Sequence, residues 1–352
     1  MLLSDSGAGA VSTSAGSAIL MDADSGRILY AQNEREQRPI ASITKLMTAL
    51  VVCERMADLE AEVTISSEAA APRGSSMYLV PGEQVTVRAL LYGLLLSSGN
   101  DAAVALAIYC AGDAGRFTAW MNARASELSM ADTHFDNPNG LDSPTHYSTA
   151  YDMALLARAC LRNETVAEMV ATKSIVLGER TLVNHNKLLW RYPDCVGMKT
   201  GYTDLAGRTL ISSACRNGQT LVAVTLRDPN DWEDHKLLLD YGFENFPEFQ
   251  LTRTAKIAYR VKVAGSLVPA VMVATDKELR YPMGTEEQVS AKVTLPPLVR
   301  APVAMGETLG TLSFYLDGKE IGTTNLTAVQ NIPDNVAPVK FRIMALLDLL
   351  RK

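Results

Sequence analysis

The order of its periodic segments predicts an α/β fold of the α+β kind for this chain, with helices packed on an antiparallel sheet and a small all-β domain after it. Helical patterns fill residues 42–161, between a hairpin pattern near the N-terminus and β-rich runs that begin after about residue 173. Beyond Pro247 no long helical pattern appears until the C-terminal end. With 352 residues, 47% of them hydrophobic, the chain can build more than one core.

The N-terminal part predicts a lead-in followed by a hairpin. Residues 1–16 are rich in Gly, Ala and Ser, which is typical of a flexible segment. Two apolar runs, 18–21 and 27–30, then flank a short turn-forming stretch. The first twenty residues lack a charged n-region and a continuous apolar h-region, so they predict no signal peptide. Both a cytoplasmic protein and a chain that starts near a mature N-terminus fit this observation.

The middle of the chain predicts several helices. Apolar residues recur at three- and four-residue steps after Ser42, which predicts a helix that begins at or beside this serine. Thr86 has the position of an N-cap for a helix over 87–96, which ends just before Ser98. Further helical patterns cover residues 101–111, 116–130 and 148–161.

Strand patterns return after these helices. Residues 209–214 and 220–226 are separated by a turn with an Asn-Gly pair, a strong hairpin signal. An amphipathic pattern over 232–243 predicts a helix that packs back on the sheet. We therefore expect one large domain, residues 17–249, whose antiparallel sheet is assembled from both ends of the domain.

The C-terminal part predicts a separate small β-rich domain over residues 250–338. Its short strand patterns are separated by Gly and Pro and cover residues 255–263, 270–274, 289–295 and 312–315. The terminal amphipathic segment 339–352 is apolar with basic edges and is too short to span a bilayer. It fits either a helix docked on the domain or an interfacial membrane anchor.

Composition excludes several classes of function. The net charge of −6 argues against binding of nucleic acid, which normally requires a basic face. The five cysteines are odd in number and lack paired spacing, so they predict neither a disulfide framework nor a metal site. The four histidines show no metal-ligand spacing either. We therefore expect no metal and no cofactor.

Three short segments carry the chemistry: Ser42-Ile43-Thr44-Lys45, Ser98-Gly99-Asn100 and Lys199-Thr200-Gly201. Each alone is a weak signal, since Ser-x-x-Lys occurs about once by chance in a chain of this size. The second segment fits a helix C-cap, and the third fits an exposed strand end. In combination they supply a serine, an amine one helical turn away, a second hydroxyl-amide pair and a cationic strand.

A serine hydroxyl needs a neighbouring base to become a nucleophile. On a helix, Lys45 lies on the same face as Ser42, but lysine normally keeps its proton at neutral pH. A base role therefore requires a lowered pKa for Lys45. We expect the ammonium group of Lys199 to contribute to that shift if the two lysines lie close together.

The three segments match the motif set of penicillin-binding proteins and class A β-lactamases. Longer runs, 41–50, 93–103, 137–142 and 197–203, resemble the low-molecular-weight D-alanyl-D-alanine carboxypeptidases. The similarity extends from about residue 17 to 245, and the trailing β domain also fits this group. The resemblance implies their fold and their activity, the removal of the terminal D-alanine from peptidoglycan stem peptides.

The resemblance also implies roles for individual residues. Ser42 would attack the carbonyl of the penultimate D-alanine and form an acyl-enzyme, and Lys45 would accept the serine proton. Ser98 would relay a proton to the departing D-alanine. Asn100 would hold both Lys45 and the substrate amide.

Four residues of the third segment would bind the substrate. Lys199 and Thr200 would bind its terminal carboxylate. Gly201 would let the substrate backbone approach the strand edge. The backbone N–H groups of Ser42 and Tyr202 would form the oxyanion hole. β-Lactams, which imitate the D-Ala-D-Ala end, would acylate the serine and leave slowly.

Two alternatives remain at the level of sequence. Class A β-lactamases carry a Glu-x-x-Leu-Asn segment, and the nearest candidate, at Glu164, lacks the Leu-Asn pair. A non-catalytic sensor of β-lactams or of the cell wall would not need the full set of reactive residues. Because the implied substrate lies outside the cytoplasmic membrane, we expect an extracytoplasmic protein of the cell envelope, with peripheral membrane association through the C-terminal segment.

Overall fold

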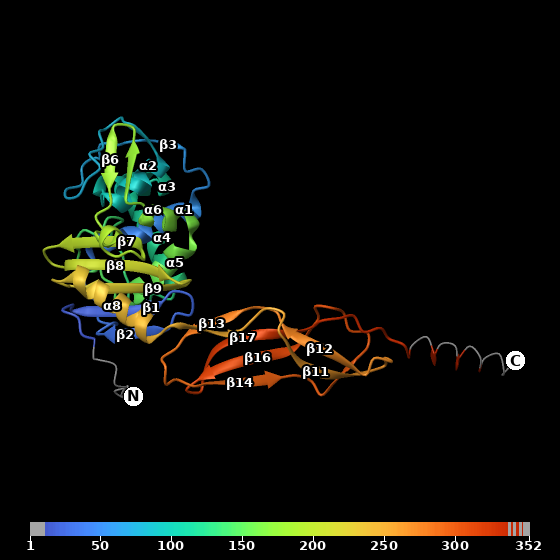
Figure 1. Ribbon diagram of the computed structural model, residues 1–352. Coiled ribbons are helices and arrows are strands. Elements are labelled where there is room, and N and C mark those ends of the chain that lie inside the picture. The colour runs from blue at the N-terminus through green and yellow to red at the C-terminus, as the bar shows by residue number, and fades with distance from the viewer. Residues whose placement is uncertain (1–10, 337–338, 341–342, 345–346, 348–352) are drawn as a thin grey trace. The chain divides into compact units, whose positions relative to one another are not determined.

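The computed structural model describes residues 11–336 together with 339–340, 343–344 and 347 (Figure 1). Residues 1–10 of the expected lead-in and most of the terminal segment lie outside these described residues. The chain divides into two compact units, Met1–Asn245 and Phe246–Lys352.

A five-stranded antiparallel sheet organises the first unit, in the strand order β2-β1-β9-β8-β7. Its strands are β1 Ser17–Asp22, β2 Ile28–Gln32, β7 Cys195–Thr203, β8 Gly207–Arg216 and β9 Gln219–Leu226. The N-terminal hairpin therefore pairs with the late hairpin through β1 and β9, which confirms the prediction of a sheet assembled from both ends. This order leaves β7, which carries Lys199, at an edge of the sheet.

Helices cover both faces of this sheet. The helices of the unit are the 3₁₀ turn η1 Ala41–Thr44, α1 Lys45–Arg55, α2 Val87–Leu96, α3 Asn100–Ala111, α4 Ala114–Glu127, α5 Ala150–Arg162, α6 Glu164–Ala171, α7 Leu188–Arg191 and α8 Asp231–Asn245. Side chains alternate along β8: Ser212 bonds to His235 of α8, whereas Thr209 bonds to the carbonyl of Ile40 before η1. Thus α8 lies on one face, as predicted (Figure 1), and the hydrogen bond of Thr209 places η1 on the other.

Local capping explains where these helices begin. The Thr86 hydroxyl accepts a hydrogen bond from the Ala89 amide, as expected, and Thr149 caps α5 in the same way. The helices expected over 101–111, 116–130 and 148–161 are present, and their ends differ from the expected ones by at most three residues. Helix α6, which the sequence reasoning missed, is a short helix capped by Asn163. Two small two-stranded sheets complete the unit: β3 Glu62–Thr64 with β4 Gln84–Thr86, and β5 Ser174–Leu177 with β6 Arg180–Val183.

The expectation of a flexible lead-in over residues 1–16 is wrong for its last three residues. The Ser14 hydroxyl lies within hydrogen-bond distance of the carboxylates of Asp228 (2.9 Å) and Asp234 (2.7 Å), and the Ser14 amide donates to Asp234. The Gly16 amide donates to the carbonyl of Leu226. Residues 14–16 are therefore bound to the sheet, because they continue the path of β1 beside β9.

The second unit is an all-β domain around a six-stranded sheet in the order β14-β16-β17-β12-β11-β15, with β15 parallel to β11. Its strands are β10 Glu248–Thr252, β11 Ile257–Ala264, β12 Ala270–Thr275, β13 Leu279–Pro282, β14 Val289–Thr294, β15 Leu298–Arg300, β16 Thr308–Leu316 and β17 Lys319–Ala328. Strand β17 was not predicted because its sequence, KEIGTTNLTA, is largely polar. Within the described residues, no helix is long and apolar enough to cross a membrane.

Candidate active site

Ser42 lies in a tight turn that precedes helix α1. Residues 41–44 form the 3₁₀ turn η1, and α1 begins only at Lys45. The helix expected at or beside the serine is therefore present, with one 3₁₀ turn at Ser42 before the α-helix. Ala41, the first residue of this turn, has a φ of +50°, in the left-handed region that non-glycine residues seldom adopt.

The amine of Lys45 is the centre of the site. Its Nζ atom lies 2.8 Å from Ser42 Oγ, 2.8 Å from Asn100 Oδ1 and 2.5 Å from the carbonyl oxygen of Asn139. The two asparagine oxygens can only accept hydrogen bonds. A neutral lysine donates its two protons to them and keeps its lone pair for the hydroxyl of Ser42. This is the arrangement that a general base requires.

Burial and a second lysine both favour the neutral form of Lys45. Its side chain is fully buried, and this loss of solvation lowers its pKa well below 10.5. The charge of Lys199 lowers that pKa further, whereas Asp101 raises it. The sequence reasoning named Lys199 but did not anticipate that burial is the larger cause. Burial likewise lowers the pKa of Lys199 to about 7.

The side-chain amide of Asn100 is oriented by a neighbouring loop. Its Nδ2 donates to the carbonyl of Arg73 at 2.6 Å, which directs Oδ1 toward Lys45. The backbone amide of Asn100 donates to the carbonyl of Ser75. Ser98 lies just before helix α3, where it is buried and has a φ of +59°. The hydrogen bonds found among the described residues do not join its hydroxyl to Ser42 or Lys45.

Strand β7 brings the third segment to the serine. The Lys199 amine donates to the carbonyl of Thr200 at 2.9 Å. A Cβ atom at Gly201 would lie 2.4 Å from Thr209 Oγ1 and 2.9 Å from the backbone nitrogen of Ser42. Gly201 is therefore required because the turn at Ser42 packs against it, a reason that differs from the expected approach of substrate.

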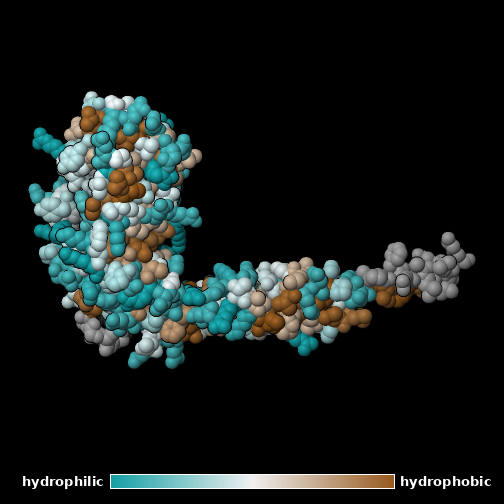
Figure 2. All heavy atoms as spheres, turned by 45° about the horizontal axis from the view of Figure 1, so that its top comes forward, coloured by the Kyte–Doolittle hydropathy of each residue, from teal (hydrophilic) through white to brown (hydrophobic). Residues whose placement is uncertain are grey.

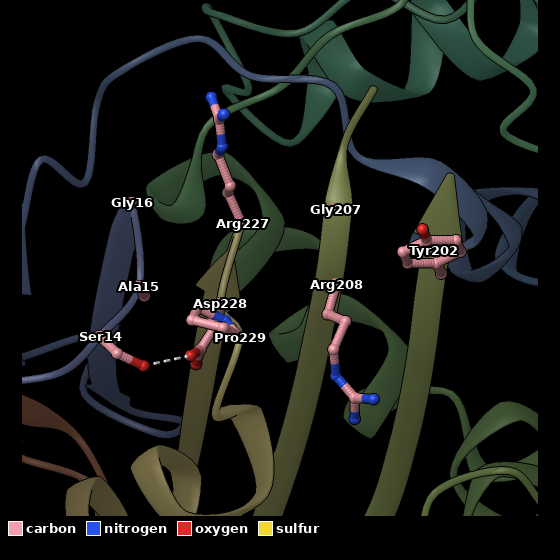
Figure 3. Close-up of a pocket in the computed structure, with 9 residues that line it drawn as sticks. All are labelled: Ser14, Ala15, Gly16, Tyr202, Gly207, Arg208, Arg227, Asp228 and Pro229. Carbon is pink, nitrogen blue, oxygen red and sulfur yellow. Dashed lines mark hydrogen bonds between the residues drawn. The ribbon is translucent and has the colours of Figure 1, made fainter. Parts of the chain in front are cut away.

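A cavity of about 610 Å³ opens beside Tyr202 (Figure 3). It is lined by residues at the ends of β7, β8 and β9 and by residues 14–16. Figure 3 shows the Ser14 hydroxyl directed at Asp228, and Arg208 directed away from Tyr202. Arg208 makes a bidentate ion pair with Asp231. The cavity thus adjoins the candidate site without containing Ser42 or Lys45.

The loop over residues 137–142 supplies contacts that the sequence reasoning missed. It provides the Asn139 carbonyl that accepts from Lys45, and Asp142 accepts from the hydroxyl of Thr203 at 2.8 Å. The Asn-Pro-Asn-Gly turn was a visible signal for this loop. The acceptor itself was not visible, because every residue has a backbone carbonyl.

The chemistry of this cluster is that of a serine, an amine base and hydrogen-bond donors. In the part of the chain that the structure describes, no group of three or more His, Cys, Asp or Glu side chains could hold a metal ion. Cys195, at the start of β7, has a pKa raised to about 11 by burial, so its thiol stays protonated at neutral pH.

Each of the two units matches a model of a known protein family. A family model described as D-alanyl-D-alanine carboxypeptidase matches residues 5–230. A second model, described as penicillin-binding protein 5, C-terminal domain, matches residues 250–334.

Individual relatives agree with these matches. The chain is 32% identical to D-alanyl-D-alanine carboxypeptidase DacF of Bacillus subtilis, covering 90% of this chain and 85% of the relative. It is 35% identical to DacD of Escherichia coli, covering 90% and 87%. The crystal structure of penicillin binding protein 5 from Haemophilus influenzae superposes with a TM-score of 0.78 at 31% identity, over 93% of this chain and all of that one.

The buried lysine predicts how stability depends on pH. Lys199 has a pKa of about 7 in the folded chain and an ordinary value of 10.5, so the unfolded chain binds more protons between these values. The free energy of unfolding should therefore rise as pH increases from 7 to 10. Lys199→Met removes this titration. Urea unfolding at several pH values should show wild type gaining stability relative to the variant, and a constant difference would contradict the lowered pKa.

Proposed function

This chain belongs to the D-alanyl-D-alanine carboxypeptidase family, and we propose that Ser42 is the nucleophile with which it removes the terminal D-alanine from peptidoglycan stem peptides. The enzyme is a serine peptidase, as its family assignment states. The observation that carries the proposal is the position of Lys45 Nζ, 2.8 Å from Ser42 Oγ and bonded to two oxygens that only accept.

Acylation begins with the transfer of the Ser42 proton to the neutral Lys45. The serine oxygen forms a bond to the carbonyl carbon of the penultimate D-alanine. The backbone N–H groups of Ser42 and Tyr202 hold the oxyanion. The peptide C–N bond then breaks, and the departing amine takes the proton from Lys45 through the hydroxyl of Ser98. The proximity of Gly201 to the Ser42 amide supports this pairing of the turn with β7.

Deacylation reverses these proton transfers. A water molecule attacks the ester carbonyl and gives one proton to Lys45. The bond from the carbonyl carbon to Ser42 Oγ breaks, and Lys45 returns the proton to that oxygen. The products are free D-alanine and the shortened peptide. Asn100 keeps Lys45 in place through both half-reactions.

The terminal carboxylate of the substrate pairs with Lys199 and with the hydroxyl of Thr200. The buried Lys199 amine loses protonation at about neutral pH, and a bound carboxylate favours its charged form. A β-lactam presents both a carboxylate and an acylating carbonyl. It therefore acylates Ser42 and remains attached, since the Glu-x-x-Leu-Asn segment of class A β-lactamases is missing from the sequence.

The site of action follows from the substrate. Stem peptides lie outside the cytoplasmic membrane, so the enzyme acts in the cell envelope. Its C-terminal segment supports peripheral membrane association: Val339, Ile343 and Leu347 are about half exposed, and their spacing places them on one face of a helix. Figure 2 shows apolar side chains exposed beside the grey atoms at this end of the chain.

The nucleophile can be tested directly. A peptide ending in D-Ala-D-Ala should release D-alanine with wild type, and Ser42→Ala should lower kcat by at least about 10³-fold. The variant should keep the wild-type melting temperature, because it removes only one oxygen atom. D-alanine release is measured with a coupled D-amino acid oxidase assay. Equal release by both proteins would refute the role of Ser42, and none by wild type would favour the sensor.

Penicillin distinguishes a carboxypeptidase from a β-lactamase. Incubation of wild type with benzylpenicillin should give a persistent mass increase of one antibiotic molecule, located on the peptide that contains Ser42. Intact-mass and peptide mass spectrometry measure the adduct. Ser42→Ala should remain unmodified. Rapid loss of the adduct with accumulation of hydrolysed penicillin would support the β-lactamase alternative.

Membrane association predicts binding to anionic lipid. The full chain should sediment with phosphatidylglycerol vesicles. The double substitution Ile343→Glu and Leu347→Glu should reduce the bound fraction at least about threefold, because it places charges on the apolar face. The double substitution Val176→Glu and Val183→Glu, which adds the same two charges at exposed positions of β5 and β6, is the matched control and should leave binding unchanged. Unaltered binding of the variant with Ile343→Glu and Leu347→Glu would contradict the association.

A further inference from the structure

A buried histidine is joined to the turn that carries Ser42. The backbone amide of Asp136 lies 3.0 Å from His146 Nδ1, and His146 Nε2 lies 2.8 Å from the hydroxyl of Thr44. That hydroxyl is in turn 2.8 Å from the carbonyl oxygen of Ala41, the residue before Ser42. Thr44 is fully buried and His146 almost so.

Chemistry fixes the direction of every hydrogen bond in this series. The amide of Asp136 can only donate, so His146 Nδ1 must accept and carry no proton. The carbonyl of Ala41 can only accept, so the hydroxyl of Thr44 donates to it and receives the Nε2 proton of His146. The histidine is therefore neutral with its proton on Nε2. Burial lowers its pKa to about 4, which agrees with a neutral ring at pH 7.

This series of hydrogen bonds ends at Ala41, a strained residue next to Ser42. Ala41 has a φ of +50°, and non-glycine residues hold such a conformation only when their surroundings fix it. Its carbonyl oxygen accepts from Thr44 on one side. On the other side it packs against Gly140, where an added Cβ atom would lie 2.0 Å away.

The same histidine also fixes the loop that binds Lys45. Asp136, whose amide bonds to His146, comes three residues before Asn139, whose carbonyl accepts from the Lys45 amine. One imidazole ring thus connects the Ser42 turn with the loop that holds the base. His146 itself contacts neither Ser42 nor the reacting atoms in the hydrogen bonds described.

We propose that His146 is a positioning residue, which acts through Thr44 to hold Ser42 Oγ within reach of the Lys45 amine. This inference rests on the proposed role of Ser42. We expect His146 to contribute to the rate of acylation and little to substrate binding. The proposed partners of the substrate carboxylate, Lys199 and Thr200 on β7, are not part of this series of hydrogen bonds.

The test is a double-mutant cycle with Thr44→Val and His146→Ala. Each single substitution should lower kcat for D-alanine release by about 10- to 100-fold, with KM changed less than about threefold. The double variant should be no slower than the slower single variant within about threefold, since both substitutions break the same series. His146→Gln, whose side-chain amide can donate to Thr44, should recover part of the rate.

His235 provides the matched control. It is equally buried and lies between two hydroxyls, those of Ser212 and Thr225, but on the α8 face of the sheet. His235→Ala should lower the melting temperature while the rate of the folded enzyme stays near wild type. If His146→Ala behaves in the same way, or if the effects of the two substitutions in the cycle multiply, the proposal is wrong.

An NMR measurement that needs no substrate tests the role of His146 independently of the proposed function. Nitrogen-15 NMR of the His146 ring should show a proton on Nε2 and none on Nδ1 in wild type. The opposite tautomer would overturn the series whether or not the enzyme releases D-alanine. The expected tautomer in a chain that releases no D-alanine would support the series and refute the proposed function alone.

Discussion

The site depends on keeping one amine, that of Lys45, without a charge and without solvent. Burying an ammonium ion is costly unless each of its protons is bonded and its charge is compensated, and a neutral amine avoids that cost. The structure surrounds Lys45 with two acceptors and one hydroxyl, from α3, from the 137–142 loop and from the preceding turn. The packing of these three segments therefore determines the chemistry of the serine.

Close backbone contacts let these segments meet. Gly201 allows edge strand β7 to pack against the turn at Ser42, and Gly140, with a φ of +84°, allows the loop to reach the carbonyl of Ala41. A Cβ atom at either position would overlap backbone or a buried hydroxyl. The turn is thus held between a strand and a loop that are distant in sequence. A serine in such a position has little freedom to move away from the Lys45 amine.

Most features that the sequence predicted have local causes. The N-cap at Thr86 and the Asn-Gly hairpin follow from spacing and turn chemistry. The pairing of N-terminal and late strands is a long-range feature, and it was expected from the order of helical and strand patterns along the chain. The three segments were also recognisable as a set. What could not be predicted depends on atoms common to all residues or on tertiary packing: the Asn139 carbonyl, the left-handed Ala41 and the binding of residues 14–16 to the sheet.

Under the proposed mechanism, the protonation states of the two buried lysines, Lys45 and Lys199, depend on each other. If both were charged in the empty site, their repulsion and their desolvation would act together against folding. A pKa near 7 lets Lys199 be neutral in a fraction of molecules at neutral pH and become charged when a carboxylate binds. The carboxylate then offsets the new charge, so that the proton is taken up by Lys199 and not by Lys45. Substrate binding therefore supplies the cation that orients the peptide without removing the base that activates Ser42.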